Sequence, residues 1–143
     1  MKSINFDDGY RTYDINGDPD RIIKVRVTDP NINARYKAAK DELDRIFDEA
    51  AALAKLTESD LARLENGVRE QLNFIFDSDI CTPAFGNASM LTIDNGSTIV
   101  VNFVEALLAQ VQADREAALA ALKARKEEKI NAYIAPITEG DLE

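Results

Sequence analysis

The chain has 143 residues, of which 17 are basic and 26 acidic, so its formal charge is −9 and its isoelectric point is near 4.6. It contains no His, no Trp and one cysteine, Cys81. A disulfide within the chain and a zinc site made of Cys and His ligands are therefore excluded. Nucleophile pairs that need a histidine base are excluded as well, together with the side chain that most often transfers protons near neutral pH.

Length and hydropathy predict one soluble, cytoplasmic domain over 1–143. A chain of this length buries roughly 68–70% of its unfolded surface on folding, so a core can form without disulfides or metals. The sequence has no apolar run of the roughly 18 to 20 residues that a membrane span needs. Residues 1–10 are polar and lack the apolar centre of a signal peptide. We therefore expect no contact with a membrane.

The negative charge is concentrated in two segments. Residues 57–97 hold seven acidic and two basic side chains, and residues 136–143 hold three acidic ones. This balance argues against nucleic-acid binding, which needs clustered Lys and Arg to displace counterions from phosphates. Acids spread over so many residues favour an ordinary solvated surface over a mimic of DNA phosphates.

The first 29 residues predict a β-hairpin region. In its second strand, expected over 21–27, apolar residues alternate with basic ones, which is the period of a half-buried strand. The first strand is expected over 11–15. Residues 16–20 contain Asn-Gly and Asp-Pro, two turn-forming pairs that suit a connection better than a paired strand. A third short strand around Ile4 and Phe6 is compatible with the sequence.

The region 30–135 is expected to be helical, which makes the predicted fold α+β and predominantly helical, with three main helices after the hairpin. The first helix is expected over about 30–55, where apolar residues recur at helical spacing. Asp29 is its expected N-cap, because Pro30 suits the first helical position, where no backbone N–H is needed. The hairpin is expected to pack on this region, since an isolated hairpin is marginally stable in water.

The second helix is expected over about 58–77. Thr57 and Asp60 have the spacing of a capping box at its start. Gly67 lies in its interior at a cost of about 1 kcal/mol relative to Ala, and close packing against a neighbour is the usual reason for such a glycine. The following segment, 77–97, loses the helical period and is expected to be a loop with its own apolar anchors.

The third helix is expected over 98–135, followed by an acidic tail over 136–143. Unbroken, it would span about 57 Å, more than the diameter of roughly 37 Å expected for a compact domain of this length. It is therefore expected either to break or to project beyond the body. Residues 123–129 are mostly charged, which is typical of a solvated or partner-facing extension. The alanine-rich stretch 117–121 would allow close helix packing, so a homo-oligomer is compatible with the sequence.

Carboxylate and thiol side chains provide no strong candidate for chemistry. Asp14 opens a series of alternate oxygen ligands like a calcium loop, but the sixth and twelfth positions are Pro and Val instead of Gly and Glu. Asp77 and Asp79 have no nearby group to separate their pKa values as an acid and a base. Cys81 has no local base and is expected to be a small buried hydrophobe. We therefore expect no metal, no cofactor and no enzymatic activity.

Three phenylalanines surround the predicted loop: Phe74, Phe76 and Phe85. Two interpretations remain open. The rings can fill the core under the loop, or some of them can belong to a protein-binding surface. Phe74 and Phe76 flank the apolar face of the second helix, so the side chains cannot all point inward from one helix.

Short motifs along the chain resemble those of small proteins encoded in Firmicutes prophages. The motifs are Gln71–Asp77, Pro83–Gly86 and Asn102–Leu108, with the opening Ile4–Tyr10 and Asn16–Asp18. In that group a helix leads into a Phe-Gly loop and then into a helix that begins with Phe and a Leu pair, and its members resemble tail assembly chaperones. Gly86 fits such a loop, because a glycine after a buried Phe can reverse the chain with positive φ.

The resemblance implies a non-enzymatic phage or prophage protein, a tail assembly chaperone or accessory factor that binds a structural tail protein, the tube or the tape measure. The alternative is an acidic inhibitor of a host defence or nucleic-acid-binding protein, which requires carboxylates clustered on one face. The candidate partner-binding residues are Phe74, Phe76, Phe85, Gly86, Phe103, Leu107, Leu108 and Tyr133.

Overall fold

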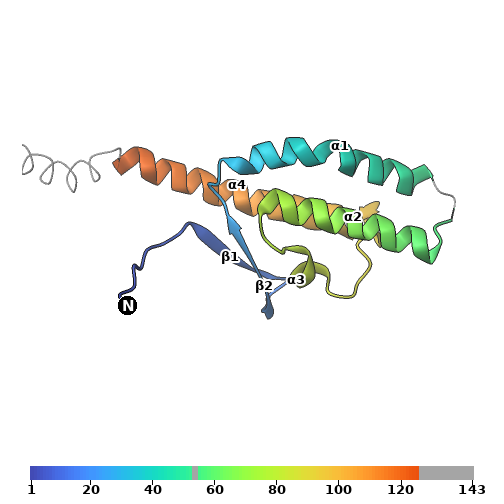
Figure 1. The fold of residues 1–143 in the computed structure, drawn as a ribbon, viewed down its shortest axis with the longest axis horizontal. Helices are drawn as coiled ribbons and strands as arrows, with labels where there is room; N and C mark the ends of the chain where they lie inside the picture. The colour runs from blue at the N-terminus through green and yellow to red at the C-terminus, as the bar shows by residue number, and fades with distance from the viewer. Residues whose placement is uncertain (53–54, 126–143) are drawn as a thin grey trace, which may run out of the picture.

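The computed structural model describes residues 1–52 and 55–125, and these form an α+β fold dominated by helices (Figure 1). The elements in chain order are β1 (Tyr10–Ile15), β2 (Asp18–Arg26), α1 (Asn31–Ala52), α2 (Glu58–Phe76), α3 (Cys81–Phe85), β3 (Ile93–Asp94), β4 (Ser97–Thr98) and α4 (Ile99–Arg125). The predicted fold class is confirmed: an N-terminal hairpin is followed by three main helices, and the last of the three, α4, is the longest.

The β1–β2 hairpin has a tighter turn than the five-residue connection expected from the sequence. Asn16 and Gly17 adopt positive φ angles of 54° and 77°, which a two-residue type I′ turn requires. Pro19 therefore lies inside β2, and its placement in the connection was wrong. The register is irregular opposite this point, between Asp14 and Ile15 of β1, so Pro19 falls in a bulge where no ladder N–H is needed.

Two other segments differ from the expectations. Residues 77–97 are not a loop throughout, because they include the short helix α3 and the strand β3, which pairs with β4. The third strand considered around Ile4 and Phe6 does not form, and residues 1–9 lead into β1 without strand structure. Hydrophobic periodicity could not predict α3 and β3 or exclude a strand at residues 4–6, since all of these segments are too short to show a helical or strand pattern.

The helices α1 and α2 form an antiparallel pair (Figure 1) and approach each other closely at Gly67. A Cβ atom placed on Gly67 would lie 2.7 Å from Cδ1 of Ile46, which is buried in α1. The missing side chain therefore lets the two helices meet at this level. The close packing expected from the sequence is confirmed.

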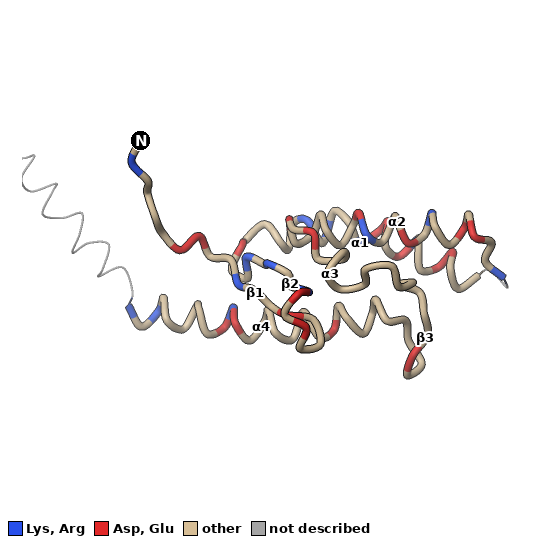
Figure 2. Tube along the Cα trace, turned by 90° about the horizontal axis from the view of Figure 1, so that it is seen from below, with Lys and Arg blue, Asp and Glu red and all other residues tan. Residues whose placement is uncertain are grey.

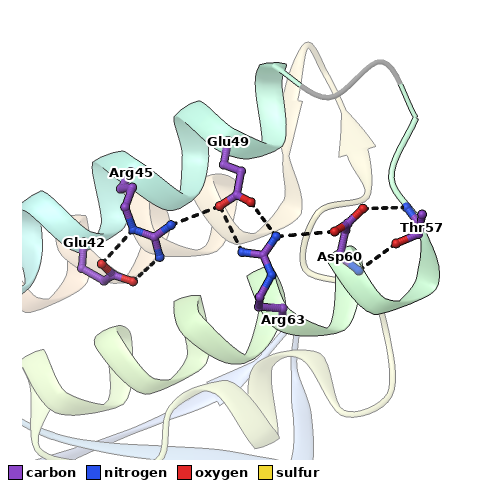
Figure 3. Close-up of polar contacts among 6 residues, drawn as sticks. All are labelled: Glu42, Arg45, Glu49, Thr57, Asp60 and Arg63. Carbon is purple, nitrogen blue, oxygen red and sulfur yellow. Dashed lines mark hydrogen bonds and ion pairs between the residues drawn. The ribbon is translucent and has the colours of Figure 1, made fainter.

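A capping box begins α2 and adjoins a set of ion pairs between the two helices (Figure 3). Thr57 Oγ1 accepts a hydrogen bond from the Asp60 N–H at 3.1 Å, and the Asp60 carboxylate accepts one from the Thr57 N–H at 3.3 Å. Arg63 forms a two-pronged ion pair with Glu49 of α1, which also contacts Arg45. Exposed ion pairs add little stability singly, so these contacts mainly fix the alignment of the helix ends.

Arg35 connects the start of α1 to the end of α2. Its Nε donates to the carbonyl of Ile75 at 2.8 Å, and its Nη2 donates to the Asp29 carboxylate at 2.8 Å. The same carboxylate accepts the N–H of Asn31 at 2.9 Å, which confirms Asp29 as the cap of α1. The Arg35 hydrogen bond, followed by that of Asn31, lowers the pKa of the Asp29 carboxyl below its ordinary value.

The core is one apolar cluster to which the hairpin and all four helices contribute. Its largest fully buried side chains are Ile23, Val25, Val27, Ile46, Leu64, Val68, Ile80, Met90 and Val100. The inward face of β2 is thereby covered by helices. This arrangement supplies the burial that a two-stranded hairpin needs for stability.

The first half of α4 packs on the core and the second half projects beyond it (Figure 1). Val100, Leu107 and Val111 are buried, whereas the residues from 115 to 125 are exposed except for the half-buried Ala118. At 27 residues the helix is about 40 Å long, so the predicted projection is confirmed. The expected continuation to 135 and the acidic tail lie outside the described residues.

We predict that Gly67→Ala destabilises the protein by about 1 kcal/mol. Overpacking a core costs about 1–3 kcal/mol and exceeds the gain of about 1 kcal/mol in helix propensity. In an Ile46→Val background, which removes the clashing Cδ1, the same change is expected to be neutral or stabilising. Urea unfolding of the four proteins measures this coupling, and strictly additive effects would contradict the packing role of Gly67.

The Asp29–Arg35 pair is expected to make stability depend on acidic pH. A carboxyl whose pKa is lower in the folded than in the unfolded state stabilises the fold above its unfolded pKa, near 3.8 here. That contribution is lost as the pH falls through the folded-state pKa. Asp29→Asn keeps the cap but removes the charge.

The wild type should therefore exceed Asp29→Asn in free energy of unfolding above about pH 5, and the difference should shrink as the pH falls below about 4. Urea unfolding of both proteins across this range measures the effect. A difference that stays constant with pH would contradict it.

Candidate functional site

A groove with a volume of about 1330 Å³ lies between the hairpin, α3 and α4. The hairpin contributes residues 12–16 and 20–23, the α3 segment contributes 82–86, and α4 contributes one side of its first half, from Ile99 to Gln110. These three parts are distant in sequence. The groove therefore exists only because the core brings the hairpin, α3 and α4 together.

An aromatic pair forms the apolar floor of the groove. The rings of Phe85 in α3 and Phe103 in α4 meet edge to face, with centroids 5.3 Å apart and planes at 78°. Such pairs contribute about 0.5–1.5 kcal/mol beyond their buried area. Leu107 and Ile99 of α4 line the same surface. The floor is therefore apolar and held by contacts between two helices.

Gly86 ends α3 directly beside this pair. Its backbone angles are φ 55° and ψ −119°, and its N–H donates to the carbonyl of Thr82 at 2.9 Å. A residue with a side chain is strained in this conformation. The chain reversal with positive φ expected after Phe85 is confirmed.

Arg21 joins the hairpin to α3. Its Nε donates to the carbonyl of Pro83 at 2.8 Å, and its Nη2 donates to the carbonyl of Ala84 at 2.5 Å. Sequence analysis did not single out Arg21, and no local pattern could have done so, because its partners lie more than 60 positions along the chain. Arg21 therefore sets the distance between two walls of the groove.

Asp77 and Asp79, considered above as an acid and a base, stabilise the backbone between α2 and α3. Asp77 is the left-handed C-cap of α2, with φ 50°. Asp79 Oδ1 accepts the N–H of Thr82 at 3.1 Å and the side-chain amide of Asn73 at 3.1 Å. Asn73 Oδ1 in turn accepts the N–H groups of Ile80 and Cys81 at 3.0 and 3.2 Å. These contacts hold the start of α3 against α2.

Tyr13 ties β1 to α4 at the end of the groove. Its hydroxyl donates to Asp114 Oδ2 at 2.5 Å. Burial and the contact with Asp114 raise the pKa of the Tyr13 hydroxyl above its ordinary value of 10.0. The hydroxyl therefore stays protonated and keeps donating at neutral pH. Asp114 lies just before the projecting half of α4, so this bond marks where the helix leaves the body.

The predicted partner-binding residues fall into four places. Those that line the groove are Phe85, Gly86, Phe103 and Leu107. Phe76 and Phe85 are both buried in the core, which is the first of the two interpretations left open for the phenylalanines, although Phe85 also borders the groove. Phe74 on α2 and Leu108 on α4 are both 48% exposed and lie outside the groove lining. Tyr133 lies outside the described residues.

The rim of the groove is mainly acidic. Among the described residues, the charged side chains that line it are Asp14, Asp20, Asp94 and Arg21, and Arg21 donates hydrogen bonds to backbone carbonyls. Within residues 1–52 and 55–125, no group of three or more His, Cys, Asp or Glu side chains could hold a metal ion. The groove therefore offers an apolar floor with a negative border.

Cys81 is fully buried, as expected. Burial raises the pKa of its thiol to about 11, so the thiol is neutral at physiological pH and is no nucleophile.

In the described part of the chain, none of the helices is long and apolar enough to cross a membrane.

Comparison with known proteins found no matching family model, no matching curated protein and no matching solved structure.

We predict that Tyr13→Phe lowers the free energy of unfolding by about 1.5–3 kcal/mol, because it removes one hydrogen bond to a charged acceptor. Amide hydrogen exchange should accelerate around Asp114 more than in α1. Tyr10→Phe is the matched control. Tyr10 stacks under Arg26, with the guanidinium carbon 4.4 Å from the ring centroid, and the ring is retained in the variant. Equal exchange in both variants would contradict the role of Tyr13.

Proposed function

We propose that the protein is a non-enzymatic phage or prophage protein, a tail assembly chaperone or accessory factor, that binds an apolar segment of a tube or tape-measure protein in the groove. The observation that carries the proposal is the meeting of Phe85 and Phe103 on the groove floor. Phe85 belongs to the motif Pro83–Gly86 and Phe103 to the motif Asn102–Leu108, two of the motifs on which the resemblance to prophage proteins rests.

The chemistry of the groove suits a protein ligand. Burying apolar side chains on its floor yields roughly 25 cal/mol per Å² of apolar surface. An amphipathic helix or an extended segment can present such side chains while its polar face meets the rim. The acidic rim favours a segment with Lys or Arg beside its apolar residues. The net charge of −9 helps keep a complex with an aggregation-prone partner in solution.

The alternative, an acidic inhibitor of a nucleic-acid-binding protein, has less support. It requires an array of carboxylates on one face. Figure 2 instead shows acidic residues along the N-terminal segment, the hairpin, α1, α2, the β3 turn and α4. On α1 and α2, the carboxylates of Glu42, Asp44, Glu49 and Asp60 are paired with Arg or Lys, which reduces the field that a basic partner would meet.

Capture of a tail protein from co-expressing cells tests the proposal. The tagged wild type should retain the tube or the tape-measure protein of the same phage. Ala106→Glu should lower the retained amount at least about tenfold, because Ala106 is exposed in the folded chain and lines the groove.

Ala109→Glu is the matched control, since Ala109 is equally exposed on the same helix but lies outside the groove lining. Both variants should keep the wild-type helix content. Failure of the wild type to retain any tail component would overturn the proposed function. Equal loss in both variants would overturn the groove as its site.

A further inference from the structure

Residues 1–8 form an N-terminal arm that leaves its large apolar side chains in water. Every residue of the arm is exposed, and Ile4 and Phe6 are 89% and 77% exposed. Both Figure 1 and Figure 2 show the arm leaving the start of β1 and pointing away from the helices. Single exposed apolar residues are ordinary. Two large ones on one unsupported segment indicate a surface that is covered in an assembly.

The base of the arm is held by polar contacts, whereas its tip is not. Asp7 Oδ1 accepts the N–H of Gly9 at 2.9 Å, and the carbonyl of Asp8 accepts a hydrogen bond from Arg26 Nε at 3.0 Å. Gly9 has φ 90°, which a residue with a side chain rarely adopts. The arm is therefore aimed by its base, and its direction does not depend on Ile4 or Phe6.

The arm has the pattern of a strand but no strand to pair with. Ile4 and Phe6 alternate with polar residues, so an extended chain places both on one face. Within the described residues the hairpin sheet consists of β1 and β2 alone, and no third strand pairs with either. The base of the arm lies at the Tyr10 end of the hairpin, whereas the hairpin residues that line the groove are 12–16 and 20–23, on either side of the turn at the other end, and the arm runs away from α3 in both Figure 1 and Figure 2. The arm therefore points away from the groove of its own chain.

We infer that the arm of one copy binds in the groove of a second copy, so that the protein forms a dimer with exchanged arms. Ile4 and Phe6 then lie against apolar lining residues that keep exposed surface, such as Phe103, Ile99 and Ile22. Exchange is reciprocal in a two-fold symmetric pair, which buries both arms and both grooves.

Charge complementarity supports this occupant. Lys2 is the only charged side chain among residues 1–6, so the tip of the arm is positive. The rim of the groove carries Asp14, Asp20 and Asp94, and Arg21 is engaged with carbonyls. A positive tip on a negative rim favours the encounter and the orientation of the arm. The two acids at the base of the arm, Asp7 and Asp8, accept hydrogen bonds from the N–H groups of Gly9 and Tyr10 of their own chain.

The oligomeric state tests the inference without any tail protein. Sedimentation of the full chain over a range of concentrations should show a dimer. Ile4→Asp/Phe6→Asp should weaken the dimer at least about tenfold, because charged side chains cannot cover the apolar floor. Leu119→Asp/Leu122→Asp is the matched control, since these residues are exposed apolar positions on the projecting half of α4.

A mixing experiment identifies the surface that receives the arm. Ala106→Glu should also weaken the dimer, because it blocks the groove at an exposed position. Mixing this variant with Ile4→Asp/Phe6→Asp restores one intact arm and one intact groove, so a heterodimer should form. Ala109→Glu should leave the dimer unchanged.

A monomeric wild type, an arm variant that dimerises like the wild type, or an α4 variant that becomes monomeric would each overturn the inference. Its failure is distinguishable from failure of the proposed function, which is measured by capture of a tail protein. If both hold, arm and tail segment compete for one groove, and the arm variant should capture the tail protein at least as well as the wild type.

Discussion

The hydrogen bonds from Arg21 to the carbonyls of Pro83 and Ala84 are the contacts on which the groove depends. The helix α3 has five residues and is too short to be stable by itself. It persists because side chains from other elements satisfy its ends: Asn73 and Asp79 at its start and Arg21 at its last turn. Without α3 in this position, Phe85 would not reach Phe103 and the floor would be lost.

The helix α4 combines two roles along one continuous element. Its first half supplies a wall of the groove and core residues such as Leu107. Its second half has no core to cover and leaves the body just beyond Asp114, where Tyr13 holds it. The Tyr13 bond is partly buried and made to a charged acceptor, which strengthens it relative to an exposed neutral hydrogen bond. This bond therefore ties α4 to the hairpin beside the groove, before the helix leaves the body.

The exposed arm and the groove have complementary properties. The arm carries exposed apolar side chains, and the groove is lined in part by apolar side chains such as Phe103 and Ile22. A chaperone that must hold apolar segments of another protein benefits from a groove that its own arm can cover, because an uncovered apolar groove also invites aggregation. The proposed dimer and the proposed partner binding thus use one surface at different times.

Local physics accounts for what the sequence by itself determined. Hydrophobic periodicity predicted the hairpin and the three main helices, and short-range hydrogen-bonding patterns predicted the cap at Asp29 and the capping box at Thr57. The close approach at Gly67 and the reversal at Gly86 were also predictable, because a glycine is costly unless the backbone requires it. Apart from the contact of Gly67 with Ile46 of α1, each of these features depends on the conformation of a few consecutive residues.

Only the tertiary structure decided which distant residues meet. Two of these contacts join positions far apart in the sequence: Arg21 anchors α3 across 62 positions, and Tyr13 bonds to Asp114 across 101. The bulge that admits Pro19 into β2 depends on how the two strands pair. The same holds for the phenylalanines, since one helix face cannot say that Phe76 and Phe85 are both buried in the core, that Phe85 also borders the groove, and that Phe74 is exposed. Such contacts follow from how all the elements share one core, and a pattern read along the chain carries no information about that packing.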